Sequence, residues 1–138
     1  MRLEGEPTRS LRAAADGRSF AILDQTLLPW RVVWLTIETT EGAAHAIRSM
    51  QVRGAPLIGA VGAYGLALAL GEDASDATLD AAHAMLAATR PTAINLRWAL
   101  DRVRDAVRNQ PHAARAAIAW DVAGAICDDD VATCEAIG

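Results

Sequence analysis

The stretch MQVRGAPLIGAVGAYGLALALG, residues 50–71, decides the fold of this chain. From Pro56 to Leu70 it contains small and apolar residues and one tyrosine, so a helix formed here would be apolar nearly all round. Such a helix has to be covered by neighbours on most of its sides. Pro56 suits the first turn, where its missing N–H costs nothing, and Gly71 suits the C-terminal end. The sequence therefore predicts a buried central helix from about Pro56 to Leu70.

Three glycines, Gly59, Gly62 and Gly65, recur at intervals of three residues along this predicted helix. Each interior glycine costs about 1 kcal/mol of helix stability relative to alanine. We interpret them as positions where another segment approaches the backbone closely. A neighbouring helix is the first interpretation, and direct contact with a ligand is the alternative.

The residues before the central helix predict a small β element and then a first helix. Residues 19–37 are rich in strand formers and are divided by the sequence LPW, which predicts two short antiparallel strands at about residues 20–37. Thr39 or Thr40 can cap the helix that follows. A glycine and a proline come after it, so we expect this first helix to end near Val52.

Three more helices are predicted after residue 71. One begins at Ser75 or Asp76 and ends before Arg90, the next begins around Thr92, and the last runs from about Ala113. Their apolar stripes recur at helical spacing. These stripes are Leu79, Ala82, Met85 and Leu86, then Leu96, Ala99, Leu100, Val103 and Val107, then Ile118, Val122 and Ile126.

The predicted fold class is therefore α+β and mostly α, with a small antiparallel β element followed by a five-helix bundle. Residues 1–18 are polar and are expected to form an N-terminal arm. Residues 19–138 are expected to form one domain, with its helices at about residues 40–137. The chain has 138 residues, 52% of them hydrophobic and 22% charged, which is typical of a globular domain.

Composition also excludes several function classes. The net charge of −4 gives no basic footprint of the kind that nucleic-acid binders carry. The apolar run is shorter than the ~20 residues that a membrane-spanning helix needs. The first residues lack the apolar core of a signal peptide. We therefore expect a cytoplasmic protein with neither nucleic acid nor membrane among its partners.

Arg53 and Gly54 lie where the predicted first helix ends and the central helix begins. The first turn of a helix has free N–H groups and about half a positive charge. An arginine beside such an end makes a site for a phosphate or a carboxylate. Arg90, at the end of another predicted helix and before a threonine cap, would add a second guanidinium to the same anion. The alternative is that each arginine caps a helix C-terminus or pairs with a carboxylate.

No metal and no organic cofactor is expected. His45, His83 and His112 do not cluster, and no pair of them has metal-ligand spacing. Cys127 and Cys134 match no zinc pattern. If both cysteines lie on one helix, they are about 10.5 Å apart along its axis, which is too far for a disulfide.

Two motifs, AIRSMQVRGAPLIGAVGAYGLAL and TRPTAINLRWALDRV, resemble the two N-terminal signatures of the methylthioribose-1-phosphate isomerase family. DQTLLP before the second predicted strand and DDDVATCEAIG at the end follow that family's order. The resemblance covers the chain from about residue 18. The wider superfamily includes ribose-1,5-bisphosphate isomerases and the regulatory subunits of translation initiation factor 2B. The sequence RPTAINLRWA favours the methylthioribose branch.

The resemblance implies an aldose–ketose isomerase of methionine salvage, which converts 5-methylthioribose 1-phosphate to 5-methylthioribulose 1-phosphate without a cofactor. It implies that the sugar phosphate is bound through Arg53, Gly54 and Ala55 and through Arg90. The family's catalytic cysteine lies in a Thr-His-Cys-Asn run in a second, Rossmann-like domain, together with a catalytic aspartate. Neither motif occurs in this sequence, so we assign no catalytic residue to this chain.

We therefore expect the chain to be the N-terminal, substrate-binding part of such an isomerase and to be inactive without the C-terminal domain. That missing domain and a second copy in a homodimer are the expected partners, because an uncovered apolar face promotes association. The alternatives are a regulatory or scaffold module of the translation initiation factor 2B type and a ribose-1,5-bisphosphate isomerase.

Overall fold

The computed structural model describes residues 2–3, 6–7, 11–13, 19–23, 34–49, 55–90 and 93–137. Within these ranges, five strands precede five helices. The strands are β1 (Arg2–Leu3), β2 (Glu6–Pro7), β3 (Leu11–Ala13), β4 (Phe20–Leu23) and β5 (Trp34–Ile37). The helices are α1 (Thr40–Arg48), α2 (Ala55–Glu72), α3 (Asp76–Thr89), α4 (Ile94–Val107) and α5 (His112–Ile137). The predicted fold class is confirmed.

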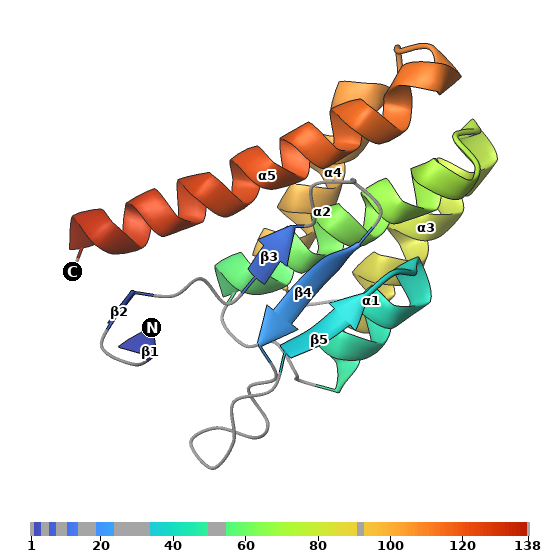
Figure 1. Ribbon diagram of the computed structural model, residues 1–138. Coiled ribbons are helices and arrows are strands. Elements are labelled where there is room, and N and C mark those ends of the chain that lie inside the picture. The colour runs from blue at the N-terminus through green and yellow to red at the C-terminus, as the bar shows by residue number, and fades with distance from the viewer. Residues whose placement is uncertain are drawn as a thin grey trace.

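The apolar stretch forms α2, which lies at the centre of the bundle (Figure 1). It packs against each of the other four helices, and residues 58–70 are buried without a break. Gly71 does not end this helix, because α2 continues to Glu72 and Gly71 keeps an ordinary right-handed backbone. No helix in the described ranges combines the length and the apolar character that crossing a bilayer requires.

The three glycines of α2 face other helices, as the first interpretation expected. A Cβ on Gly59 would lie 3.1 Å from the carbonyl oxygen of Asn95 in α4, and one on Gly62 would overlap Leu96. A Cβ on Gly65 would lie 2.7 Å from the Cβ of Ala43 in α1. The glycines therefore let α4 and α1 approach the α2 backbone.

The main sheet has the order β3-β4-β5, and both strand pairs are antiparallel. The pair of β4 and β5 is the predicted one, with Phe20 opposite Ile37. Strand β3 extends the sheet into residues 1–18, which the sequence assigned to a polar arm, and its Leu11 is buried in the core. A strand of three residues is too short to show the alternation by which strands are recognised in sequence.

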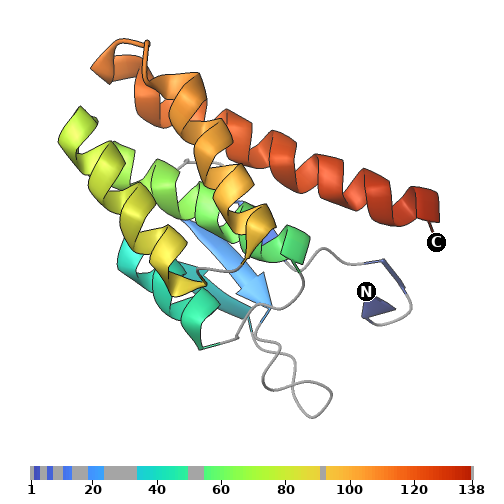
Figure 2. The same cartoon turned by 180° about the vertical axis from the view of Figure 1, so that it is seen from behind.

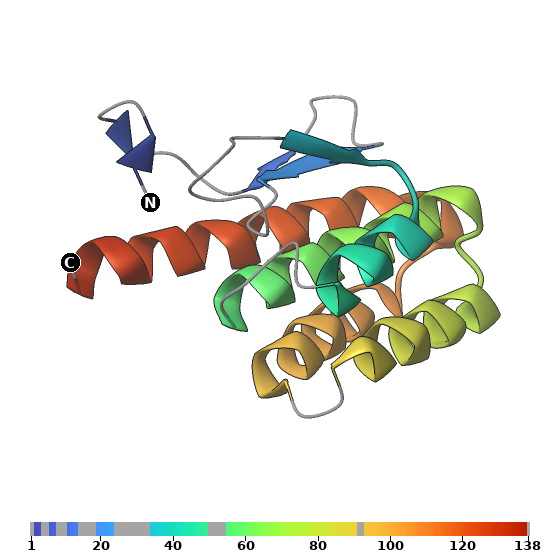
Figure 3. The ribbon, with the colours of Figure 1, turned by 90° about the horizontal axis from the view of Figure 1, so that it is seen from below.

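An aromatic cluster joins the sheet to the bundle. The ring of Phe20 in β4 stacks on Tyr64 of α2 at 5.3 Å between centroids, and Tyr64 meets Trp120 of α5 edge-on at 4.8 Å. Figure 3 shows the sheet covering one side of the layer formed by α2 and α5. Seen from behind in Figure 2, α3 and α4 lie side by side, and both also pack on α2.

Besides the end of α2, the helix boundaries differ from the predicted ones in three places. Helix α1 begins after Thr39, whose hydroxyl accepts a hydrogen bond from the Gly42 N–H, but it ends at Arg48 rather than near Val52. Helix α4 begins at Ile94, two residues after the predicted start. Helix α3 begins after its Ser75 cap and ends before Arg90 as predicted; α5 begins at His112, one residue early.

The buried stripes of α3 and α4 follow the prediction closely. All five apolar residues predicted for α4 are fully buried, whereas Met85 of α3 is half-buried. The stripe predicted for α5 is confirmed only in part, because Ile126 is buried whereas Ile118 and Val122 are half-buried at the edge of the core. The side of α5 that is most buried instead carries Arg115, Ala119, Ala123 and Ile126. Small side chains on this side permit close packing of α5.

Candidate anion-binding site

The first half of the predicted anion site lies mostly outside the described residues. Arg53 and Gly54 are not among them, and Ala55 is described only as the first residue of α2. The start of α2 is therefore where the sequence predicts it, directly after the Arg-Gly pair. The roles of these three residues stay a prediction.

Arg90, the second predicted arginine, lies at the C-cap of α3 with a backbone that is no longer helical. Its carbonyl accepts a hydrogen bond from the Ala93 N–H at 2.9 Å, which closes the turn between α3 and α4. The side chain is half-buried and makes no ion pair or hydrogen bond with any residue that the structure describes. Among these residues, the pairing of Arg90 with an internal carboxylate is therefore not seen.

Helix α4 begins without a side-chain cap. Its N-cap position is held by Ala93, which has no oxygen to accept from the first-turn N–H groups. Thr92, the cap expected from the sequence, does not occupy the N-cap position. By contrast, Thr39 caps α1 and Ser75 caps α3 through their side-chain oxygens. The leading amides of α4 therefore need an acceptor from outside the helix, such as water or an anion.

Helices α2 and α4 run in the same direction, so their N-termini lie at the same end of the bundle (Figure 3). Gly59 in the second turn of α2 packs on Asn95, and Gly62 one turn later packs on Leu96 and Leu100. Helix α3 ends at this same end, which places Arg90 beside the start of α4. We call this end of the bundle, made by the starts of α2 and α4 and by Arg90, the cradle end.

The electrostatics of the cradle end favour an anion. Two helix N-termini each contribute about half a positive charge. A guanidinium adds a full charge and donors in a planar fork that matches phosphate or carboxylate oxygens. The described part of the cradle end can therefore bind an oxyanion, while arginine stays protonated and does not serve as a general base.

The histidines and cysteines do not add a metal site to this arrangement. His83 of α3 is hydrogen-bonded through Nε2 to Asp101 of α4 at 2.7 Å, while His45 and His112 are exposed. Among the described side chains, no three His, Cys, Asp or Glu residues come together as metal ligands would. Cys127 and Cys134 both belong to α5, the single-helix case for which a disulfide between them was excluded.

Sequence reasoning missed one buried charge, Arg115, which is 3% exposed. Its Nε donates to the Gln110 carbonyl, and its Nη atoms donate to the carbonyls of Ala74 and Arg108 and to the Asp76 carboxylate. The arginine thus ties the turn before α5 to the turn before α3. The sequence contains a signal for this burial, which is the helical spacing of the residues. Arg115 lies one turn before Ala119, and Ala119 one turn before Ala123, so all three share one side of α5.

Two aspartates at the start of α3 have lowered pKa values. The Arg115 guanidinium lowers the pKa of Asp76, and hydrogen bonds from the Thr78 hydroxyl and then the Ser75 N–H lower that of Asp73. A carboxylate with a lowered folded pKa stabilises the fold above its ordinary pKa, near 3.8. This stabilisation is lost as the pH falls through the folded pKa.

We therefore expect the melting temperature to fall as the pH is lowered from 6 to below 3.8. Because Asp76→Asn removes one of the titrating groups, the variant should melt below the unmodified chain at pH 6 and show a smaller difference at pH 3. Thermal unfolding followed by circular dichroism at both pH values checks this. A difference in melting temperature that is the same at both pH values would contradict the assignment of the ion pair.

Comparison with known proteins places this arrangement in a family. Residues 51–138, which include α2, Arg90 and α4, match the Initiation factor 2 subunit family. The chain belongs to this family. Among its curated relatives, a methylthioribose-1-phosphate isomerase of Dechloromonas aromatica is 55% identical over all 138 residues. The chain spans 38% of the length of that relative.

Two solved structures share this fold. A 5-methylthioribose 1-phosphate isomerase of Pyrococcus horikoshii is 33% identical with a TM-score of 0.81, over 91% of this chain and 37% of that one. The translation initiation factor eIF-2B subunit delta of A. fulgidus is 32% identical with a TM-score of 0.81, over 91% and 38% of the two chains. Fold similarity alone therefore does not separate the enzyme from the translation factor.

Proposed function

We propose that this chain is the substrate-binding part of an aldose–ketose isomerase that acts on 5-methylthioribose 1-phosphate. The observation that supports this most is the start of α4 without a side-chain cap, beside Arg90, whose side chain pairs with none of the described residues, at the end where α2 also begins. Two curated relatives that are 55% and 52% identical to the chain carry the name of this isomerase. The product would be 5-methylthioribulose 1-phosphate.

In this proposal the cradle end binds the phosphate group of the sugar. Arg90 donates to two phosphate oxygens, and the first-turn N–H groups of α4 donate to the rest. The resemblance adds Arg53, Gly54 and Ala55 at the start of α2 as further donors. Holding the phosphate fixes the position of the sugar carbons at which the hydrogen is moved.

The chemical step needs a group that takes a proton from one carbon and returns it to the next. Arg90 does not do this, because a guanidinium has donors but no acceptor for a proton. We propose that the acid and base belong to the additional length that the relatives have, so the chain alone binds the sugar phosphate and does not turn it over. We also propose that it is cytoplasmic and forms a homodimer. Exposed Ile94 and Trp98 on α4 are consistent with association.

Calorimetric titration of the chain with 5-methylthioribose 1-phosphate tests this function. Arg90→Ala should weaken binding by about tenfold or more, because a hydrogen bond to a charged group contributes about 1.5–3 kcal/mol. Arg104→Ala is the matched control, because it removes the same charge from an arginine that pairs with Asp101 and Asp105 on the surface. Equal binding by the Arg90 variant, or turnover by the unmodified chain, would contradict the proposal.

The second candidate function is a regulatory or scaffold module, and the eIF-2B subunit delta structure is the observation that favours it. Such a module would form a stable complex with another protein, and Arg53→Ala or Arg90→Ala would leave that complex intact. A ribose-1,5-bisphosphate isomerase is the remaining alternative. Titration with ribose 1,5-bisphosphate beside the methylthio substrate distinguishes these two sugar phosphates.

A further inference from the structure

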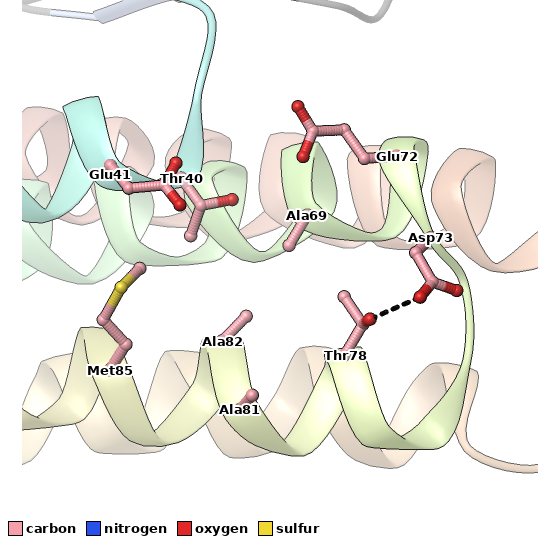
Figure 4. Close-up of a pocket in the computed structure, with 9 residues that line it drawn as sticks. All are labelled: Thr40, Glu41, Ala69, Glu72, Asp73, Thr78, Ala81, Ala82 and Met85. Atoms are coloured by element: carbon pink, nitrogen blue, oxygen red, sulfur yellow. Dashed lines mark hydrogen bonds between the residues drawn. The ribbon is translucent and has the colours of Figure 1, made fainter.

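A groove lies at the opposite end of α2 from the cradle end. Figure 4 shows its walls, with α3 on one side and the start of α1 and the C-terminal end of α2 on the other. The lining is mainly small and apolar, with carboxylates around it: Thr40, Glu41, Ala69, Glu72, Asp73, Thr78, Ala81, Ala82 and Met85. Because α2 has 18 residues, the groove is about 25 Å from the start of that helix and separate from the proposed anion site.

The dimensions of the groove suit a side chain better than a metabolite. Its volume is about 270 Å³, below the range of roughly 300–1,000 Å³ in which small-molecule sites fall. Three alanines and Met85 form the apolar part, and methionine adapts its shape readily to what it contacts. The groove can therefore take one or two side chains of an extended segment.

The charged residues that line the groove are all acidic. Glu41 and Glu72 are exposed and, among the described residues, neither makes an ion pair. Glu72 ends α2, where the helix already carries a partial negative charge and where cations are favoured. The last turn of α2 contains no basic residue, and the groove lining contains none either. Arg115 donates to the Ala74 carbonyl just beyond this end, but its guanidinium is already paired with Asp76, so the lining itself supplies no cation to offset the carboxylates.

Asp73 adds a third carboxylate to the groove lining, and the same carboxylate is hydrogen-bonded to residues at the start of α3. It accepts hydrogen bonds from the Ser75 N–H at 3.1 Å and from the Thr78 hydroxyl at 2.8 Å. These bonds lower the pKa of Asp73, so it is ionised at neutral pH. The hydrogen bonds that Asp73 accepts do not neutralise its carboxylate, so a negative charge remains at the edge of the groove.

We propose that this groove docks a segment of a partner protein in which an arginine or lysine lies next to an aliphatic residue. The aliphatic side chain packs on Ala69, Ala82 and Met85, which line the floor. The cation pairs with Glu72 and Glu41 and offsets the charge at the end of α2. Charge complementarity selects this partner over an acidic or a neutral one.

A fluorescein-labelled peptide, Gly-Leu-Arg-Leu-Arg-Gly, tests the proposal by fluorescence anisotropy with the 138-residue chain. Its acidic counterpart, Gly-Leu-Glu-Leu-Glu-Gly, is the control probe. We expect saturable binding of the basic peptide that weakens as salt is raised, because exposed charges are screened. The double variant Glu41→Gln, Glu72→Gln should weaken it at least fivefold. Both glutamates are exposed, so these changes leave the core intact.

A second pair of variants separates the groove from general attraction to an acidic protein. Ala81→Arg places a cation in the groove and should prevent binding, whereas Ala88→Arg adds the same charge two turns further along α3, outside the lining. Both alanines are exposed, so both variants should fold. The proposal is overturned if the acidic peptide binds as well as the basic one, if the basic peptide does not bind, or if Ala88→Arg weakens binding as much as Ala81→Arg does.

Discussion

Replacing Arg115 with methionine is expected to lower the free energy of unfolding by about 3 kcal/mol. The guanidinium is 3% exposed and donates to the carbonyls of Gln110, Ala74 and Arg108. Methionine fills a similar volume but donates to none of them, and each buried carbonyl that loses its donor costs about 1–3 kcal/mol unless water replaces it. The loss of the Asp76 ion pair adds to this effect.

Urea unfolding of Arg115→Met and Arg108→Met measures the difference. Arg108 pairs with Asp80 on the surface, with side chains that are 42% and 59% exposed. Exposed ion pairs contribute about 0–1 kcal/mol, so the Arg108 variant should be nearly as stable as the unmodified chain. If both substitutions lower the free energy of unfolding by the same amount, the buried hydrogen bonds of Arg115 do not stabilise the two turns as we propose.

Gly65→Ala is expected to destabilise the chain by about 2 kcal/mol and to lower its melting temperature by about 8 °C. The new Cβ would lie 2.7 Å from the Cβ of Ala43, which is fixed to the α1 backbone and has no rotamer to change. The two helices have to separate, and this stretches the bond from the Thr40 hydroxyl to the Gly65 carbonyl, which is 2.9 Å. The cost exceeds the gain of about 1 kcal/mol in helix propensity.

Gly71→Ala is the matched control on the same helix. A Cβ on Gly71 would meet no atom within 4 Å, so this variant should be stabilised by up to about 1 kcal/mol. Differential scanning calorimetry of both variants shows the sign directly. Melting temperatures that rise in both would mean that α1 and α2 do not approach each other as closely as the structure shows.

Much of the fold follows from hydrophobic pattern alone. Helix α2 is predicted by its all-round apolar sequence, and the buried side of α4 by its spacing, because burial demands the same periodicity that the sequence shows. Strand β3 was not predicted, and on the buried side of α5 only Ile126 was. A three-residue strand has too few positions for a pattern, and in α5 the larger apolar residues are less buried than the alanines beside them.

The sequence predicts part of the geometry of the cradle end, because that geometry depends on where helices begin and end. Arg90 and the start of α2 are visible in the sequence because prolines and glycines mark the ends of helices. That α4 begins at Ala93 without a side-chain cap could not be predicted, because the adjacent threonine is the better capping residue. Only the packing of the two parallel helices shows that these features meet at one end of the bundle.

The most direct test of the cradle end is an NMR titration of the ¹⁵N-labelled chain with 5-methylthioribose 1-phosphate. We predict that the amide signals of Ile94, Asn95 and Leu96 shift with the ligand, together with the side-chain Nε–H of Arg90. The amides of Glu72 and Asp73, at the other end of α2, should stay in place. Ligand-dependent shifts that leave the first turn of α4 unchanged would contradict the account.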